Sequence, residues 1–261
     1  MDIVAVDWSG AAQGAAARIW LAQVIDGVLV DLHDGRSRAQ VVADLVALRD
    51  RCPQGLVAGL DFSFSFPEWF LRERHCATVD ELWATVEREG ERWLADCAPP
   101  FWGRPGRRRP ELSEPLRRAE RSISVGGISP KSVFQIGGAG AVGTGSIRGM
   151  PHLRELRRAG FSVWPFDPVS PWTLLEIYPR LLTGPVRKSD PAQRALYLDG
   201  VPWHVPTRFA RAMRASEDAF DAGISALVMY DHRADLAALQ PTDDPVTLVE
   251  GDVWRPSKIT S

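Results

Sequence analysis

The sequence predicts an α/β protein with one mixed β-sheet flanked by helices. Three short β-type segments open the chain with only turn residues between them, which favours an antiparallel meander. An amphipathic helical segment and a fourth apolar segment follow, and a helical crossover of this kind returns the chain parallel to an earlier strand. At 261 residues, with 45% hydrophobic residues, the chain is able to bury a sizeable core.

The first half of this sheet follows from composition and spacing. Its strands are rich in aliphatic and β-branched residues and are separated by turns that contain glycine and aspartate. Val41, Leu45 and Leu48 recur at helical spacing before the fourth strand, which predicts the crossover helix. The strands are expected at residues 2–8, 17–25, 27–34 and 55–61, and the helix at 37–51.

The rest of the chain predicts a single domain over residues 1–261, interrupted by an insertion at about 64–150. The insertion contains an amphipathic helix at 79–98 and a loop rich in proline, glycine and arginine at 99–115. Helical and strand patterns then resume. We expect helices at 151–160, near 190–198 and from 216, strands at 161–166 and 172–178, and a strand or ordered arm at 246–256.

A glycine-rich run, GAGAVG at residues 138–143, matches the G-x-G-x-x-G pattern of dinucleotide-binding proteins. In those proteins a helix begins at the motif, and its N-terminus binds the pyrophosphate. Here Gly145, Gly149 and Pro151 follow, which argues against a helix start, and the motif stands in the middle of the chain. We therefore expect residues 137–149 to form a mobile loop that binds no dinucleotide.

Four acidic residues stand alone in apolar segments. They are Asp7 after the first strand, Asp61 after the fourth, Glu176 at the end of a later strand, and Asp221 in the helix from 216. An ionised carboxylate in apolar surroundings costs several kcal/mol unless it is paired, hydrogen-bonded or bound to a metal. Taken alone, Asp7 is equally compatible with stabilising the Ser-Gly turn that follows it. Four such acids require a shared explanation.

The expected topology brings these acids together. A first strand that pairs in parallel with the fourth places Asp7 and Asp61 at the same end of the sheet, where ligands bind in α/β folds. Asp218 and Asp221 are three residues apart and project from one face of their helix. Asp218 is also compatible with a capping turn at the helix N-terminus, whereas Asp221 lies deeper in the helix.

Carboxylates gathered in this way repel one another unless a proton or a cation lies between them. Hard oxygen ligands without cysteine select Mg²⁺ or Mn²⁺ over zinc. Two such ions about 4 Å apart activate water and stabilise the leaving oxygen in phosphodiester cleavage. The acids therefore predict a metal site suited to this hydrolysis.

Several segments together resemble a bacterial family of unknown function whose members are identified from sequence as RNase H-fold nucleases. These segments are VAVDWSGA, LEIYP, SVFQIGGAGAVGTGSIRGM and EDAFDAGISAL, which span most of the chain. The resemblance extends to the RNase H-like superfamily, particularly its Holliday-junction-resolvase branch. It implies an RNase H-like fold, metal-ligand roles for Asp7, Asp61 and Asp221, and a role for Asp218 as a further ligand or helper. Glu176 matches the E-x-Y-P strand end of the family and completes the candidate catalytic set, and Asp61 stands where many relatives of the fold carry glutamate.

A nucleic-acid partner follows from this interpretation. The segment WGRPGRRRP (102–110) and three nearby arginines predict a local basic surface, with Phe101 and Trp102 available for base stacking. The alternative is a solvated arginine-rich loop. The three arginines are Arg117, Arg118 and Arg121.

Two other classes of function stay open. One is a phosphotransferase or ATPase of the actin and sugar-kinase group, which shares this sheet and begins with a similar aspartate-containing strand and turn. Those proteins need two such domains, and 261 residues with one meander are too few. The other is a binding protein on the same fold that keeps the acids without turnover.

Charge and composition exclude further classes. A net charge of −2 predicts no general attraction to nucleic acid or to a membrane surface. Cys52, Cys76 and Cys97 form no C-x-x-C pair, which argues against a disulfide framework and a zinc site. No signal-peptide pattern opens the chain, and no apolar run approaches the roughly 18 residues of a membrane span, so we expect a cytoplasmic protein without a membrane partner.

Overall fold

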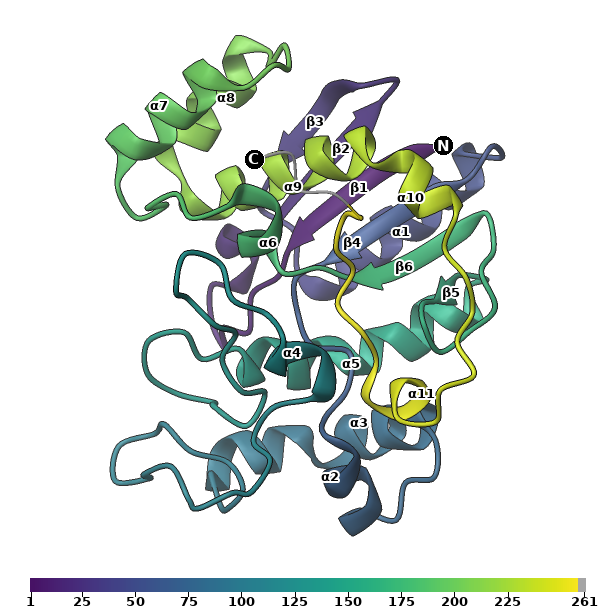
Figure 1. The fold of residues 1–261 in the computed structure, drawn as a ribbon, viewed down its shortest axis with the longest axis vertical. Coiled ribbons are helices and arrows are strands. Elements are labelled where there is room, and N and C mark those ends of the chain that lie inside the picture. The colour runs from purple at the N-terminus through teal and green to yellow at the C-terminus, as the bar shows by residue number, and fades with distance from the viewer. Residues whose placement is uncertain (258–261) are drawn as a thin grey trace.

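The computed structural model describes residues 1–257, which fold around a six-stranded sheet with helices on both faces (Figure 1). The strand order across the sheet is β3-β2-β1-β4-β6-β5. The prediction of a mixed sheet flanked by helices is confirmed. The strands are β1 (Asp2–Asp7), β2 (Trp20–Ile25), β3 (Val28–His33), β4 (Leu56–Leu60), β5 (Ser162–Val163) and β6 (Trp172–Glu176).

The pairing of the strands determines which strand ends are adjacent. β1, β2 and β3 form the expected antiparallel meander, whereas β1 pairs in parallel with β4, and β4 in parallel with β6. The register joins Val6 to Leu60 and Leu60 to Glu176. The carboxyl ends of β1, β4 and β6 therefore lie side by side at one edge of the sheet.

The helices begin where the sequence offers caps. Ser37 caps the crossover helix α1, because its hydroxyl accepts from the Gln40 backbone N–H and its own N–H donates to the Gln40 side chain. Thr78 caps α3 in a similar way. The helices are η1 (Ala15–Arg18, 3₁₀), α1 (Arg38–Arg51), α2 (Glu68–Glu73), α3 (Val79–Asp96), α4 (Arg118–Arg121), α5 (Gly143–Arg158), α6 (Pro179–Thr183), α7 (Pro191–Gly200), α8 (Thr207–Ala215), α9 (Glu217–Asp231), α10 (Arg233–Ala237) and α11 (Thr247–Glu250).

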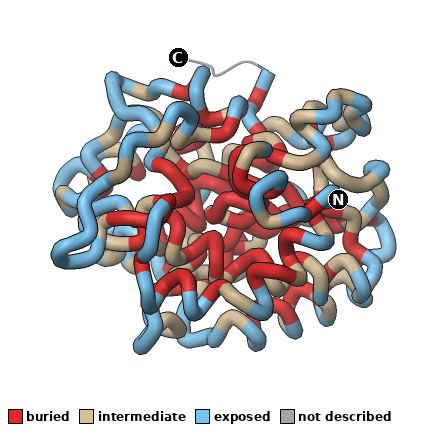
Figure 2. The backbone as a smooth tube through the Cα atoms, turned by 90° about the horizontal axis from the view of Figure 1, so that it is seen from below, coloured by how far each residue is buried: buried red, intermediate tan, exposed pale blue. Residues whose placement is uncertain are grey.

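Both faces of the sheet are buried, which explains why β1 is apolar along its whole length. Val4 and Val6 face a core shared with α1, α3 and α5, and Ile3 and Ala5 face a second core shared with α9. Buried backbone accordingly runs through the centre of the molecule (Figure 2). Within residues 1–257, no helix is both long enough and apolar enough to span a membrane.

The glycine-rich run differs from its prediction. A helix was expected only from residue 151, but α5 begins at Gly143, the third glycine of the motif, and includes Pro151. A Cβ atom on Gly143 would lie 2.0 Å from the Val133 carbonyl oxygen, and one on Gly149 would lie 2.6 Å from the Phe62 ring. These glycines therefore permit close packing of a helix, and the loop that precedes it is confined to residues 137–142.

The C-terminal arm, which we define as residues 246–256, completes the edge of the sheet. It contains the short helix α11 and then runs beside the end of β6, where Val253 bridges to Glu176 and the Trp254 N–H donates to the Glu176 carbonyl at 2.9 Å. An ordered arm was one of the two expected forms of this segment.

Candidate active site

Asp7 and Asp61 lie at the carboxyl ends of neighbouring parallel strands. The backbone N–H of Asp61 donates to the Val6 carbonyl at 3.0 Å, which continues the β1–β4 pairing to the two acids. Both side chains are partly exposed. The charge of Asp61 raises the pKa of Asp7, because the two carboxyl groups lie close together.

Asp221 reaches the same place from α9, which packs across β1 and β2. Its side chain is only 7% exposed. Lys188 donates from Nζ to Asp221 Oδ2, whereas Asp221 Oδ1 is buried and has no hydrogen-bond partner among the described residues. The structure thus brings Asp7, Asp61 and Asp221 together from three separate elements.

The pKa values of all three acids are raised. Burial, followed by the charges of Asp61, Asp221 and Asp218, raises the pKa of Asp7 well above 3.8. Burial and then the charge of Asp221 raise the pKa of Asp61 to about 7. Burial raises the pKa of Asp221 to about 6, although Lys188 opposes the shift. The cluster carries more negative charge than its surroundings compensate.

Asp218 lies on the open side of this cluster. Together with Asp7 and Arg18 it lines a shallow surface depression of about 480 Å³. Burial and the neighbouring Glu217 raise the pKa of Asp218, and Arg18 and Lys188 oppose that shift. Its side chain therefore faces the acid cluster in addition to standing in the first turn of α9.

Lys188 is the functional residue that the sequence analysis missed. It lies between α6 and α7 and is only 8% exposed. Arg194 holds this segment by donating to the Lys188 carbonyl and to the carbonyls of Met213 and Arg214 at the end of α8. The one sequence signal was that lysine is rare here: the chain has three lysines among 31 basic residues.

Glu176 is bound at the end of β6 by a fully buried arginine. Arg117 donates from Nη1 to Glu176 Oε2 at 2.8 Å and from Nη2 to Glu176 Oε1, and the Phe64 N–H also donates to Oε2 at 2.9 Å. Arg117 further pairs with Glu120 and donates to the Glu250 carbonyl at 3.0 Å. Glu176 thus borders the site, but its charge is neutralised by Arg117, which indicates that it positions the surrounding segments.

The expected basic surface is only partly formed. The arginines of segment 102–110 are exposed, but Phe101 and Trp102 are buried at 3% and 8% exposure, so the expectation that they stack on bases is wrong. They belong to an aromatic core around Phe134. Arg117 is buried, as described above. Arg118 pairs with Asp244 and Arg121 with Glu114.

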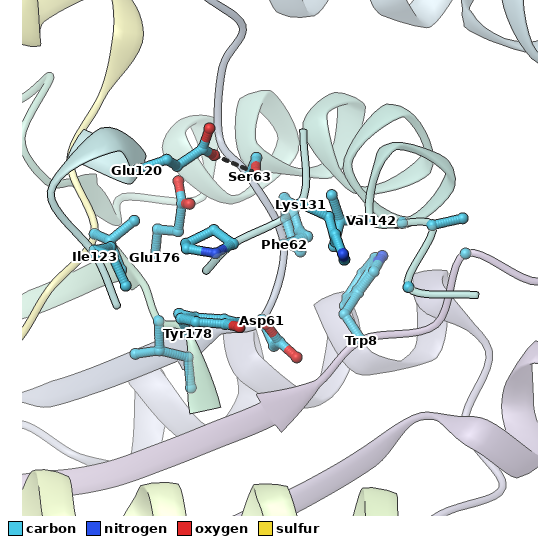
Figure 3. Close-up of a pocket in the computed structure, with 17 residues that line it drawn as sticks. Trp8, Asp61, Phe62, Ser63, Glu120, Ile123, Lys131, Val142, Glu176 and Tyr178 are labelled. Carbon is cyan, nitrogen blue, oxygen red and sulfur yellow. Dashed lines mark hydrogen bonds between the residues drawn. The ribbon is translucent and has the colours of Figure 1, made fainter. Parts of the chain in front are cut away.

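A cavity of about 230 Å³ adjoins Asp61 (Figure 3). Its walls come from segments that are distant in sequence: the turn after β1, the end of β6, the start of α5 and the C-terminal arm. Trp8 and Lys131 form one side, and Glu176 and Tyr178 the other.

The donor set suits a hard divalent cation. In the described part of the chain, no three His, Cys, Asp or Glu side chains are grouped so that they hold one ion. Mg²⁺, however, needs only one or two carboxylates, because water molecules and substrate oxygens complete its coordination. Asp7 and Asp61 lie at adjacent strand ends, and Asp221 Oδ1 is buried with no hydrogen-bond partner among the described residues. The residues present therefore fit Mg²⁺ or Mn²⁺.

Comparisons with protein-family models, with curated proteins and with solved structures found no match for this chain. The functional argument therefore depends on the site itself.

Proposed function

We propose that this protein is an RNase H-like nuclease that hydrolyses phosphodiester bonds of nucleic acid with Mg²⁺ or Mn²⁺. The observation that carries the proposal is the convergence of Asp7, Asp61 and Asp221. Burial raises the pKa values of all three acids, and the charges of neighbouring acids raise those of Asp7 and Asp61 further. A cation between these carboxylates would relieve the repulsion between them.

The topology supports the same assignment. A three-stranded antiparallel meander, followed by strands parallel to β1, is the arrangement that the resemblance to RNase H-like proteins implies. Asp7 on the first strand, Asp61 after the fourth and Asp221 on a late helix occupy the positions that it implies for metal ligands.

In this mechanism the chain's own residues hold the charges in place. Asp7 and Asp61 would hold the ion, with Asp221 as a further ligand. The bound ion would supply activation of water and stabilisation of the leaving oxygen. Lys188 remains on Asp221 Oδ2 and supplies a second, fixed positive charge beside the substrate phosphate. Asp218 extends the acidic rim, and Glu176 holds Arg117 and the end of β6.

Asp7→Asn provides the direct test. The amide keeps the volume of the side chain but removes the charge that binds the ion, so cleavage is expected to fall by at least about 100-fold while the protein stays folded. The matched control is Asp243→Asn, because Asp243 is exposed and lies outside the site. Cleavage is measured with Mg²⁺ and with Mn²⁺ on single-stranded, duplex and branched DNA and RNA.

The same assay separates the other classes of function. An Asp7→Asn variant as active as the parent would mean that Asp7 only stabilises its turn. Metal-dependent ATP hydrolysis or phosphoryl transfer by the parent, without nucleic-acid cleavage, would favour the phosphotransferase alternative. Saturable Mg²⁺-dependent binding of nucleic acid without any turnover would favour the binding protein.

A further inference from the structure

The indole N–H of Trp8 is a buried donor without an acceptor. Trp8 follows Asp7 directly, is 8% exposed and packs on Phe62 with ring centroids 5.0 Å apart. Its Nε1 has no hydrogen-bond partner among residues 1–257. Buried indole groups usually find a partner, since an unmade hydrogen bond there is costly. Trp8 lines the cavity beside Asp61, and Lys131 lines the same cavity (Figure 3).

Lys131 supplies a positive charge to the same wall. Its side chain runs along the glycine-rich segment, where a Cβ atom on Gly140 would lie 3.4 Å from Lys131 Cγ. No acidic side chain pairs with Lys131 in the part of the chain that the structure describes. Lys131 is exposed, and it brings a positive charge without a salt-bridge partner among residues 1–257 to the rim of the cavity.

The first turn of α5 is a third feature of this wall, although its first N–H, that of Gly143, already donates to the Gln135 carbonyl at 3.0 Å. This helix has 16 residues, no side-chain cap at Val142 and no acidic residue in its first turn. A Cβ atom on Gly145 would lie 3.9 Å from Trp8 Cδ1, the carbon next to the indole nitrogen. Val142 and Gly145 also line the cavity. The positive end of the α5 dipole thus faces the cavity beside Trp8.

The acids around the cavity are partly compensated. Of the three acids in its lining, Glu120 and Glu176 both pair with Arg117, so these three charged groups together keep one negative charge. The third is Asp61, which the proposed metal ion would neutralise. The cavity volume of about 230 Å³ lies below the roughly 300 Å³ at which sites for drug-sized ligands begin, so it suits a phosphate group better than a whole nucleotide.

We propose that this cavity is a phosphate-binding subsite, in which the Trp8 indole N–H, the Lys131 ammonium and the N-terminus of α5 hold a phosphate group next to Asp61. The assignment rests on the proposed function and deepens it, because it names the residues that hold the substrate's phosphate beside the metal ligands. Glycine at 140 suits its positive φ of 73°, and the lack of a side chain at Gly145 keeps the space beside Trp8 open.

The test follows the Trp8 indole N–H directly by ¹H–¹⁵N NMR of the full chain. The Trp8 cross-peak is assigned by its loss in Trp8→Phe, which keeps an aromatic ring at the site. Inorganic phosphate is titrated with and without Mg²⁺ into the parent, Lys131→Met, Lys131→Arg and the surface control Arg107→Met. Loss of one charged hydrogen-bond partner is expected to weaken phosphate binding about tenfold in Lys131→Met. Lys131→Arg and Arg107→Met should bind phosphate within about threefold of the parent.

A saturable shift of the Trp8 cross-peak that weakens in Lys131→Met supports the subsite. The absence of a saturable shift with and without Mg²⁺, or equal binding by the parent and Lys131→Met, overturns it. A second titration with a dinucleoside monophosphate distinguishes a phosphodiester from a free phosphate. Competition with inorganic phosphate supports a nucleic-acid phosphate in the subsite, and failure to compete overturns that assignment. If the parent protein binds phosphate at Trp8 but cleaves no nucleic acid, the proposed nuclease function is refuted and the phosphate-binding site is still supported.

Discussion

Asp61→Asn tests whether burial and the neighbouring acids make ionised Asp61 unfavourable in the folded protein. The pKa of Asp61 is raised from 3.8 to about 7, first by burial and then by the charge of Asp221. Between these pH values the folded state holds a proton that the unfolded state has released. The stabilising contribution of this protonated group is therefore complete below about pH 4 and is lost as the pH rises to about 7. Ionised Asp61 destabilises the metal-free protein at higher pH.

The expected magnitude follows from this shift. About three pKa units correspond to about 4 kcal/mol. Asp61 is partly exposed and its titration is linked to that of Asp7, so solvent screening and this linkage reduce the expected effect to about 1–2 kcal/mol. With a chelator at about pH 8, Asp61→Asn should raise the free energy of unfolding by this amount and Tm by roughly 2–8 °C. Near pH 4 the gain should vanish, because Asp61 is then protonated in the folded parent.

The assay compares thermal melts and urea unfolding of the parent, Asp61→Asn and the exposed control Asp243→Asn. Each protein is measured at both pH values, with chelator and with Mg²⁺. Mg²⁺ should stabilise the parent and the control more than Asp61→Asn. A ligand that binds the folded state raises the free energy of unfolding, and the variant lacks one of the carboxylates that would bind the ion. If Asp61→Asn is less stable than the parent at both pH values and keeps the full Mg²⁺ response, the claim that ionised Asp61 destabilises the folded protein is refuted. Asp61 would then stabilise the fold and bind no ion.

Three further substitutions probe the supports of the site. Lys188→Met leaves Asp221 buried without its cation, so urea unfolding at neutral pH in chelator should show a loss of about 3 kcal/mol, most of which Lys188→Arg restores. Arg117→Met strands two buried glutamates and should cost about 3–5 kcal/mol near neutral pH, with a smaller loss at acid pH as the glutamates protonate. Gly10→Ala places a carbon 2.3 Å from a backbone nitrogen of α5 and should cost about 1–3 kcal/mol. Gly200→Ala, with no atom within 4 Å, is its control, and equal melting of the two alanine variants would contradict this close approach.

The parts of the fold that were predictable depend on local pattern. The meander, the crossover helix α1 and the strands β4 and β6 follow from runs of apolar residues and from a helix cap. The meeting of Asp7 and Asp61 follows in turn, because parallel pairing of their strands fixes which ends are adjacent. Asp221 was also predictable from the sequence, because a charged residue in the middle of an apolar helix requires a partner.

The rest depended on tertiary contacts. The glycines of α5 suggested flexibility in the sequence, but they pack against Val133 and Phe62, where a side chain would not fit. Lys188 becomes a site residue only because α6 and α9 pack together, and no periodicity records that contact. Similarly, nothing near Arg117 in the sequence indicates that it pairs with Glu176.

The hydrogen bonds around Arg117 have a consequence for synthesis of the protein on the ribosome. Arg117 is bound by Glu176 and by the carbonyl of Glu250, and Val253 lies against the end of β6. While the nascent chain ends before residue 250, Arg117 lacks that carbonyl and one wall of the cavity is missing. The acids on β1, β4 and α9 have already been translated by then, but the edge of the sheet that holds them beside the cavity is still open. Completion of the candidate site therefore requires the C-terminal arm, which is translated after every acid that the site contains.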